Sequence, residues 1–420
     1  MLRKTKFVVS LNIIWHLLLD YYKMAINKLL KDRRLYVIFC ITLIAVMGVA
    51  SITPALPKIS ETLNLSKTQI GLLISAFTFP GIFLTPVAGI LADRIGRKTI
   101  LIPSLFVFAL AGFAIFYFHD FYWMIILRII QGVGAASLGS LNSTLIGDIY
   151  KGKSLPEAMG YNSSVLSLST ATYPLIGGIM AGFAWHYPFV LPLLAIPVGI
   201  FVIFGIKEPV IDKPSNFKQY LKDISTNILK KEVVAIFILG TLTFIILYGA
   251  FLTYLPFLLR QEFELDAPQI GVFLTLSSLT SAIVATQVGK LTWKYGSVFL
   301  LKTAFFLYLL VNIIIPNISN MYVFILPIMV FGIAMALNIP SLQTTLAKLA
   351  PNNQRGAFMS LNGMVIRLGQ TLGPMIIGIG YAIDGLEGAY YLGAIIAILG
   401  IVVSFTMLKE EKTQKKRTEN

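Results

Sequence analysis

The amino-acid sequence predicts an all-α membrane protein with twelve transmembrane helices in two pseudo-symmetric six-helix bundles. Three observations support this fold class. The 420-residue chain is 56% hydrophobic and only 13% charged, whereas soluble chains have about 25% charged residues. Apolar segments of about 20 residues, long enough to cross the hydrocarbon core, recur along the whole chain. A sequence repeat with an offset of 200 positions, such as Gly89 and Gly289, relates the two halves.

The apolar segments are expected to be helices, because inside lipid a helix satisfies its own backbone hydrogen bonds. Short connections such as His119–Asp120 make neighbouring helices antiparallel. The expected spans are 35–56, 69–91, 99–118, 121–147, 159–184, 188–206, 233–257, 268–292, 298–316, 321–347, 358–383 and 388–408.

A long polar stretch in the middle of the chain divides these spans six and six. The predicted organisation is a cytoplasmic N-terminal segment 1–34, a bundle 35–206, a cytoplasmic linker 207–232, a bundle 233–408 and a basic tail 409–420. Residues 1–23 contain the apolar run FVVSLNIIWHLLL after a basic start. This run lacks a small-residue cleavage site and is too short to span comfortably. An interfacial helix is one interpretation, and we favour a translation start at Met24.

The distribution of charge predicts the orientation. The net charge is +15, and the lysines and arginines gather on the side that holds both termini. This is the positive-inside pattern, so both termini are expected in the cytoplasm of a plasma or inner membrane. A nucleic-acid partner is not expected. The single cysteine, Cys40, excludes a disulfide within the chain.

No signature of catalysis or metal binding is found. His16, His119 and His186 are scattered along the sequence, and no phosphate-binding Gly-x-x-x-x-Gly-Lys pattern occurs. We therefore expect neither an enzyme nor a metal or cofactor site. An ion gradient or the substrate's own gradient must supply the driving energy.

Three motifs resemble those of the major facilitator superfamily, and the resemblance covers residues 33–408. GILADRIGRK (89–98) resembles the superfamily's loop signature, and LRIIQGVGAA (127–136) its fourth-helix motif. GYNSSVLSLSTATYPLIGG (160–178) resembles the fifth-helix motif of antiporters, and the closest subgroup is the twelve-helix drug:proton antiporters. The resemblance implies the major facilitator fold, alternating access, a substrate site between the bundles near the midplane, and a monomer.

The loop signature is expected to act as a conformational latch. Its glycines permit a tight turn and close helix approach. The resemblance implies that Asp93 faces the N-terminus of the eleventh helix, where a carboxylate is favoured. Arg97 can pair with Asp148 at the end of the fourth span. Ordinary positive-inside charge is the alternative interpretation. The predicted latch comprises Gly89, Asp93, Arg94, Gly96, Arg97, Lys98 and Asp148.

Arg128 is predicted to serve proton coupling or substrate handling. It lies inside the fourth span, where a charge costs at least about 2.5–3.5 kcal/mol. Such a side chain must face a wet cavity or a partner. Gln131 and Gly132, on the same turn, are expected to supply a hydrogen bond and a close backbone contact. The alternative is an arginine that extends to the outer surface.

The sequence matches the fifth-helix motif only in part. Gly160, Pro174, Gly177 and Gly178 match it and are expected to bend the helix and pack it closely. Ser169 and Tyr173 stand where the motif favours glycine. In the first span, Ala50 replaces the acidic residue found in many superfamily members. No acidic residue lies at mid-membrane, which leaves Asp93 and Asp148 as the plausible titrating pair and argues against a strongly cationic substrate.

The cavity is expected to hold neutral or weakly charged amphipathic molecules. Its candidate lining residues, some of which could equally bond neighbouring helices, are Thr53, Phe77, Asn142, Tyr248, Phe251, Tyr254, Asn338, Gln343, Asn362 and Gln370.

The predicted function is secondary active transport by alternating access: proton-coupled efflux of drug-like or amphipathic molecules. Lipid or glycolipid translocation is an alternative, which a groove open to the bilayer would favour. Uptake of a small metabolite is another, which accumulation would favour. A non-transporting membrane receptor is a further alternative. Such a receptor would keep its activity in the variants Asp93→Asn and Arg128→Ala.

Overall fold

A computed structural model describes residues 29–152, 154–206, 227–351 and 355–409, without the side chains of Asp93, 355–357 and Ser360. The predicted N-terminal segment with the Met24 start, most of the linker and the basic tail lie outside the described residues.

The first half of the chain forms six spans. The first span is interrupted, because Pro54 and Pro57 place a 3₁₀ turn between two α-helices. The last span begins in the same way with a 3₁₀ segment. The elements are α2 (Arg33–Ala50), η1 (Thr53–Ala55), α3 (Leu56–Leu63), α4 (Lys67–Ile95), α5 (Arg97–Ala114), α6 (Phe121–Ile149), α7 (Ser154–Phe183), η2 (Tyr187–Leu194) and α8 (Ala195–Gly205).

The second half repeats this arrangement, with a π-helix inside its first span. The elements are α10 (Lys231–Ile245), η3 (Ile246–Tyr254), α11 (Leu255–Phe263), α12 (Ala267–Tyr295), α13 (Ser297–Ile314), η4 (Ile315–Asn317), α14 (Met321–Leu349) and α15 (Arg355–Met407).

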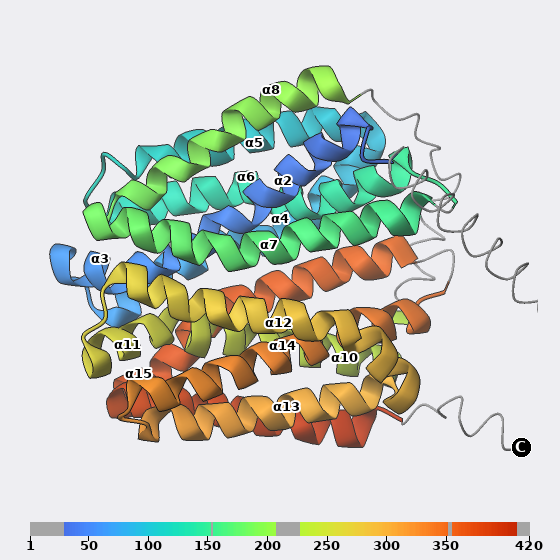
Figure 1. Cartoon of the computed structure of the whole chain (residues 1–420). Helices are drawn as coiled ribbons and strands as arrows, with labels where there is room; N and C mark the ends of the chain where they lie inside the picture. Colours follow the sequence, from blue (N-terminus) through green and yellow to red (C-terminus); the bar gives the residue numbers. More distant parts are fainter. Residues whose placement is uncertain (1–28, 153, 207–226, 352–354, 410–420) are drawn as a thin grey trace, which may run out of the picture.

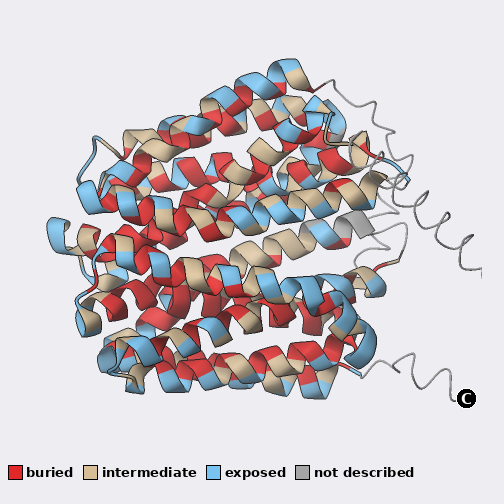
Figure 2. Ribbon diagram, in the orientation of Figure 1, coloured by how far each residue is buried: buried red, intermediate tan, exposed pale blue. Residues whose placement is uncertain are grey.

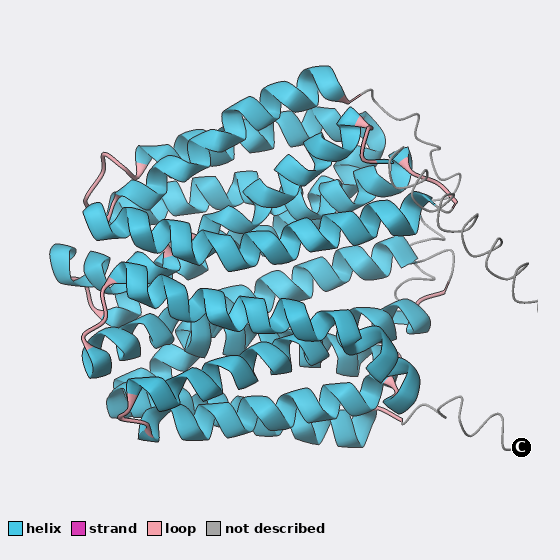
Figure 3. Cartoon of the chain, in the orientation of Figure 1, coloured by secondary structure: helices cyan, strands magenta, loops and turns pink. Residues whose placement is uncertain are grey.

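Eleven helical runs among the described residues are long and apolar enough to cross a membrane. The last run, α15, contains two non-helical residues, Asp384 and Gly385, where two helices meet at a break. It therefore provides two spans. The prediction of an all-helical membrane fold is confirmed, and Figure 3 draws the described chain as helices joined by loops.

The repeat seen in the sequence governs local structure. Ser66 with Gln69 forms a capping box at the start of α4, and Asp266 with Gln269 forms the same box at α12. Gly96, which ends α4, has φ = 102°, and the equivalent Gly296 has φ = 86°. This conformation strains any residue with a Cβ, which explains the glycine of the loop signature and of its echo.

Helix packing follows the same repeat. A Cβ added to Gly132 would collide with the carbonyl of Phe77, and one added to Gly332 would collide with the carbonyl of Ser277. Both pairs are related by 200 positions. Small residues allow such close backbone approach, which is a main source of helix association in lipid. Figure 2 shows buried residues along the faces where helices meet.

The two halves lie side by side and meet mainly through two helix pairs, α4 with α15 and α7 with α12. In Figure 1 the first half lies above the second. We call the end where α2 begins at Arg33 and α15 ends at Met407 the terminal end. The end that holds α3 and α11 is the far end.

Candidate functional site

The far end is closed by close packing between the halves. A Cβ added to Gly178 of α7 would lie 2.5 Å from the carbonyl oxygen of Ala267, and one on Gly271 of α12 would lie 2.5 Å from that of Pro174. On the opposite side, a Cβ on Gly71 would lie 3.2 Å from Cβ of Pro374. Glycine at these positions thus lets the backbones of both halves touch.

Polar contacts add to this closure. Arg260 forms an ion pair across the halves with Glu61, at 2.9 Å, and an ion pair within the second half with Asp266, at 3.0 Å. Lys67 donates to Gln261 at 2.7 Å and lies 5.1 Å from the ring centre of Tyr381. These groups are largely exposed, so the packed glycines contribute more to the closure than the ion pairs do.

At the terminal end, α7 and α12 separate. Partway along the pair, Thr275 of α12 donates a hydrogen bond to the carbonyl of Ala171 of α7, at 2.7 Å. Beyond it lies a groove of about 430 Å³, bounded by Leu168 and Leu279 and carrying several hydroxyl groups. Figure 1 shows α7 and α12 diverging in this direction. The groove lining includes Ser163, Ser164, Ser167 and Thr286.

The α4–α15 pair stays together further toward the terminal end. Ser75 donates to the carbonyl of Thr371 at 2.7 Å. Ten residues further along α4, a Cβ on Gly363 would lie 3.3 Å from Thr85. The opening is therefore asymmetric: it lies between α7 and α12.

Arg128 is fully buried in the first half, with 1% exposure, which excludes an extension to the outer surface. Its Nη1 donates to the Gly48 carbonyl at 3.0 Å and to Gln131 Oε1 at 2.8 Å. Its guanidinium also lies over the rings of Phe77 and Phe189, at 5.5 and 5.0 Å from their centres. Its Nε and Nη2 have no hydrogen-bond acceptor among the described residues.

Arg367 is a second arginine in the interior, and it contacts both halves. It lies on α15, where its Nη1 donates to Gln370 at 3.1 Å and its Nη2 lies 3.5 Å from the Ala135 carbonyl of α6. A Cβ on Gly81 of α4 would lie 2.9 Å from its Cδ. Arg367 is not among the site residues predicted from the sequence, because its cross-half contacts involve neighbours that are remote in sequence.

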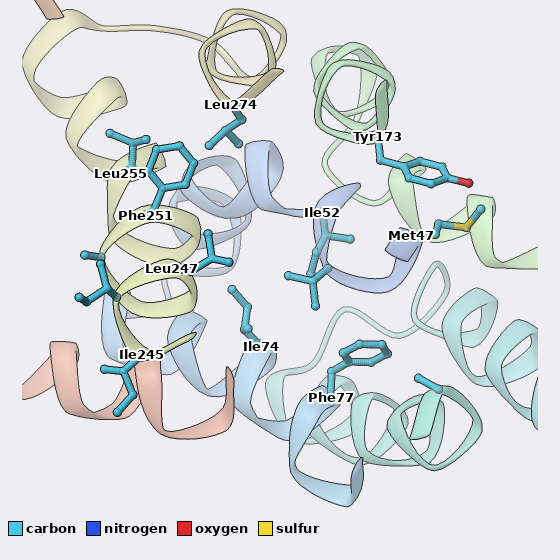
Figure 4. Packing of buried hydrophobic residues seen from close by; sticks show 14 of the residues in the cluster. Met47, Ile52, Ile74, Phe77, Tyr173, Ile245, Leu247, Phe251, Leu255 and Leu274 are labelled. Carbon is cyan, nitrogen blue, oxygen red and sulfur yellow. The ribbon is translucent and has the colours of Figure 1, made fainter. Parts of the chain in front are cut away.

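The interior carries two arginines among apolar and uncharged polar side chains. Among the described residues, no carboxylate forms an ion pair with Arg128 or Arg367. Where the halves meet, Figure 4 shows Ile52 and Ile74 from the first half and Leu247 from the second, lying toward the same region. Two guanidinium groups in an apolar setting can bind hydrogen-bond acceptors, above all anions.

The loop signature forms part of the predicted contacts. Arg97 Nε donates to Asp148 Oδ2 at 2.6 Å, and Lys98 donates to the Ile203 carbonyl at 2.7 Å. All of these residues belong to the first half. These contacts of Arg97 and Lys98 therefore join helices within that half and do not connect it to the second half. The side chain of Asp93, which the latch needs for contact with the other half, lies outside the described part.

In the fifth-helix motif, the glycines near the far end have the tight contacts. A Cβ on Gly177 would collide with the carbonyl of Ser51, and Gly178 packs on α12. Gly160, by contrast, has open space around it, with no atom within 4 Å of an added Cβ. Helix packing in this conformation therefore does not explain why position 160 is a glycine.

Several cavity candidates form hydrogen bonds between helices. Asn142 donates to Thr42 at 2.6 Å, and Thr42 in turn contacts Asn162. In the second half, Thr243 donates to Asn338 at 3.0 Å. Each of these hydrogen bonds lies within a single half. They therefore fit a role in helix packing as well as a role in lining a pocket.

The remaining candidates divide between core and interface. Phe251 stacks on Phe331 with ring centres 4.0 Å apart, and Tyr254 stacks on Tyr381 near the far end. Gln370 binds Arg367, as described above. Thr53 is buried and donates to the Val49 carbonyl of α2, and Phe77 lies beneath Arg128. Tyr248 is half-buried and Gln343 is exposed.

The fold brings together two histidines that are far apart in the sequence. The ring centres of His119 and His186 lie 5.3 Å apart, beside Trp185. Burial and the neighbouring His119 lower the pKa of His186. Among the described residues no third histidine, cysteine or acidic residue joins them in a metal-binding group.

The sequence pattern of the Major Facilitator Superfamily matches residues 38–311 and 256–420, which together cover nearly the whole chain. The chain belongs to the Major Facilitator Superfamily. It is similar to multidrug resistance protein 1 of Bacillus subtilis (strain 168), with 26% identity over 367 residues, 86% of this chain and 92% of that protein.

It is also similar to the quinolone resistance protein NorA of Staphylococcus aureus (strain MSSA476), with 24% identity over 93% of this chain and 100% of that protein. Among solved structures, an inward-facing, unoccupied bacterial homologue of the human lysosomal transporter Spinster matches with a TM-score of 0.73 and 16% identity. The match covers 89% of this chain and 97% of that one.

Membership of the Major Facilitator Superfamily makes this protein a multi-pass membrane transporter and not an enzyme. It also accounts for the two related halves, since superfamily folds place the substrate between parallel repeats.

Proposed function

We propose that this protein exports drug-like or amphipathic molecules by alternating access, in exchange for protons. The observation that carries the proposal is the asymmetric closure. The halves pack through Gly178 and Gly271 at the far end, and α7 and α12 separate at the terminal end. With both termini in the cytoplasm, as the charge distribution predicts, this conformation is inward-facing and takes substrate from the cytoplasm or the inner leaflet.

The named relatives support the substrate class, because multidrug and quinolone resistance proteins resemble the chain over most of its length. The apolar interior around Ile52, Ile74 and Leu247 suits amphipathic molecules. Coupling to protons requires a group that titrates during the cycle. The candidates for this group are Asp148, which pairs with Arg97 near the end of α6, and Asp93, whose position in the sequence lies near the end of α4.

Dye efflux by everted vesicles with an imposed pH gradient tests the proposal. We expect gradient-dependent dye movement in the wild type and a loss of at least tenfold in Arg128→Ala, because Arg128 links α2, through Gly48, to Gln131 of α6. Lys290→Gln, which removes an exposed cation elsewhere, is the matched control. Correct insertion and an unchanged elution profile are required of every variant.

If several dyes move at a rate that does not depend on the pH gradient, proton coupling is contradicted. No movement of any dye by a folded, inserted protein would contradict drug export.

Lipid translocation is a second candidate, favoured by the groove between α7 and α12. A groove of this volume, bounded by Leu168 and Leu279, accommodates one drug-sized molecule or part of a lipid. The variant Ala282→Trp fills the groove, and Ile283→Trp on the outward side of the same helix, where the residue is 70% exposed, is its control. Lipid flipping by the wild type that only Ala282→Trp abolishes would favour this candidate over export of dyes.

A further inference from the structure

We infer that the transported amphipathic molecule carries an anionic group, which binds Arg367 between the halves. This inference rests on the proposed function and specifies its substrate class. It starts from two arginines inside the spans, Arg128 and Arg367, which form no ion pair with a carboxylate among the described residues.

Arg367 is placed to meet a substrate. It is partly exposed, and it contacts α4, α6 and its own α15 at once. Gln370 holds its Nη1, while the contact of Nη2 with the Ala135 carbonyl is long, at 3.5 Å. A guanidinium held on one side and weakly bonded on the other can offer a paired donor edge to a carboxylate, sulfonate or phosphate.

Arg128 strengthens the preference for an anion. It lies on the same helix as Ala135, seven residues earlier, so the two contact points are about 10 Å apart on one face of α6. Phe77, beneath Arg128, and Gly81, beneath Arg367, are similarly about 6 Å apart along α4. Nε and Nη2 of Arg128 are buried without an acceptor among the described residues. Its charge is therefore not neutralised locally.

The neighbouring side chains indicate the rest of the ligand. Ile52, Ile74 and Leu247 come from both halves and face the same region as the apolar edge of Phe77. These apolar side chains, buried where the halves meet, favour an apolar body on the ligand, and both guanidinium groups oppose a quaternary ammonium of the same shape. The first span has Ala50, not an acidic residue, in the position that could have paired with a cation.

The test uses the purified full-length protein in proteoliposomes with an imposed pH gradient. Three probes share one aromatic body and end in a sulfonate, an uncharged amide or a quaternary ammonium. We expect the sulfonate to have the lowest KM, at least tenfold below that of the ammonium. We expect Arg367→Gln to raise the KM for the sulfonate at least tenfold and to change that for the amide less than threefold.

Arg367→Lys should recover part of the sulfonate transport, because the charge remains while the paired donor edge is lost. Lys290→Gln, an exposed cation on α12, should leave all three KM values unchanged. Thermal unfolding of each variant identifies any that fail to fold, and a folded Arg367→Lys variant then provides the comparison.

Transport of the ammonium at least as well as the sulfonate would overturn the inference and leave proton-coupled export intact. An equal effect of Arg367→Gln on all three probes would overturn it as well, since that result assigns Arg367 a purely structural role. Failure of all three probes to move would instead contradict the proposed function itself.

Discussion

Replacing Gly271 by alanine should open the far end of the molecule. The new Cβ would lie 2.5 Å from the carbonyl oxygen of Pro174, and ordinary contacts begin at 3.4 Å. The backbones of α12 and α7 must therefore move apart by about 0.9 Å. Overpacking of this kind costs about 1–3 kcal/mol. In alternating access the far ends separate in the opposite conformation, so the cost falls on the far-closed state alone.

A penalty of about 1–3 kcal/mol shifts the equilibrium toward the far-open state by about 5–150-fold. Spin labels at Thr62 in α3 and Glu262 in α11 report this change, because both positions are exposed on neighbouring far-end helices. Cys40 is first replaced by serine. Double electron–electron resonance should then show a larger population of long distances in Gly271→Ala than in the wild type.

Gly289→Ala on the same helix is the matched control, because its Cβ meets no atom within 4 Å. It should leave the distance distribution unchanged and, through helix propensity alone, slightly raise the melting temperature. If Gly271→Ala gives the wild-type distribution, the glycine contact does not hold the far end closed, and the reasoning from backbone approach fails.

Two further changes test stability. Thr243→Val removes the donor to the buried Asn338 and should lower the unfolding free energy by about 0.6–1.7 kcal/mol in a denaturant titration; an unchanged value would mean that Asn338 finds another partner. Burial opposes ionisation of Asp32, but hydrogen bonds from Arg34 and Tyr150 outweigh it and lower its pKa. Its stabilising contribution should be complete above pH about 4 and lost as the pH falls through the lowered pKa; Asp32→Asn should flatten this acid dependence, and an unaltered slope would contradict it.

The loop signature illustrates how far motif reading reaches. The sequence predicted the turn at Gly96 and the pairing of Arg97 with Asp148, and the structure contains both. Both follow from local geometry and from charges at helix ends. The role of the motif as a latch stays a prediction, since it depends on Asp93 and the other half.

The interior site was harder to predict. A polar residue in a span must find a partner, so the sequence identified Arg128, Asn142 and Gln370 as constrained. It did not show whether these side chains bond a neighbouring helix or line a pocket, because an amide suits either role equally well. The proximity of His119 and His186 was missed for a related reason: the two connections that hold them become neighbours only through the packing of the first half.

The sequence alone determined that the chain lies in a lipid bilayer and that it consists of two related halves. An apolar chain with few charges must form helices in lipid, and a 200-position offset requires two similar halves. The tertiary structure alone decided which end is closed and what the interior arginines contact. Helix sequences of this composition fit several crossings and tilts. Close contacts at glycines select one arrangement, because only there do the glycine and the neighbouring surface match. Examples are the backbone of Ala267 on Gly178 and the side chain of Arg367 on Gly81.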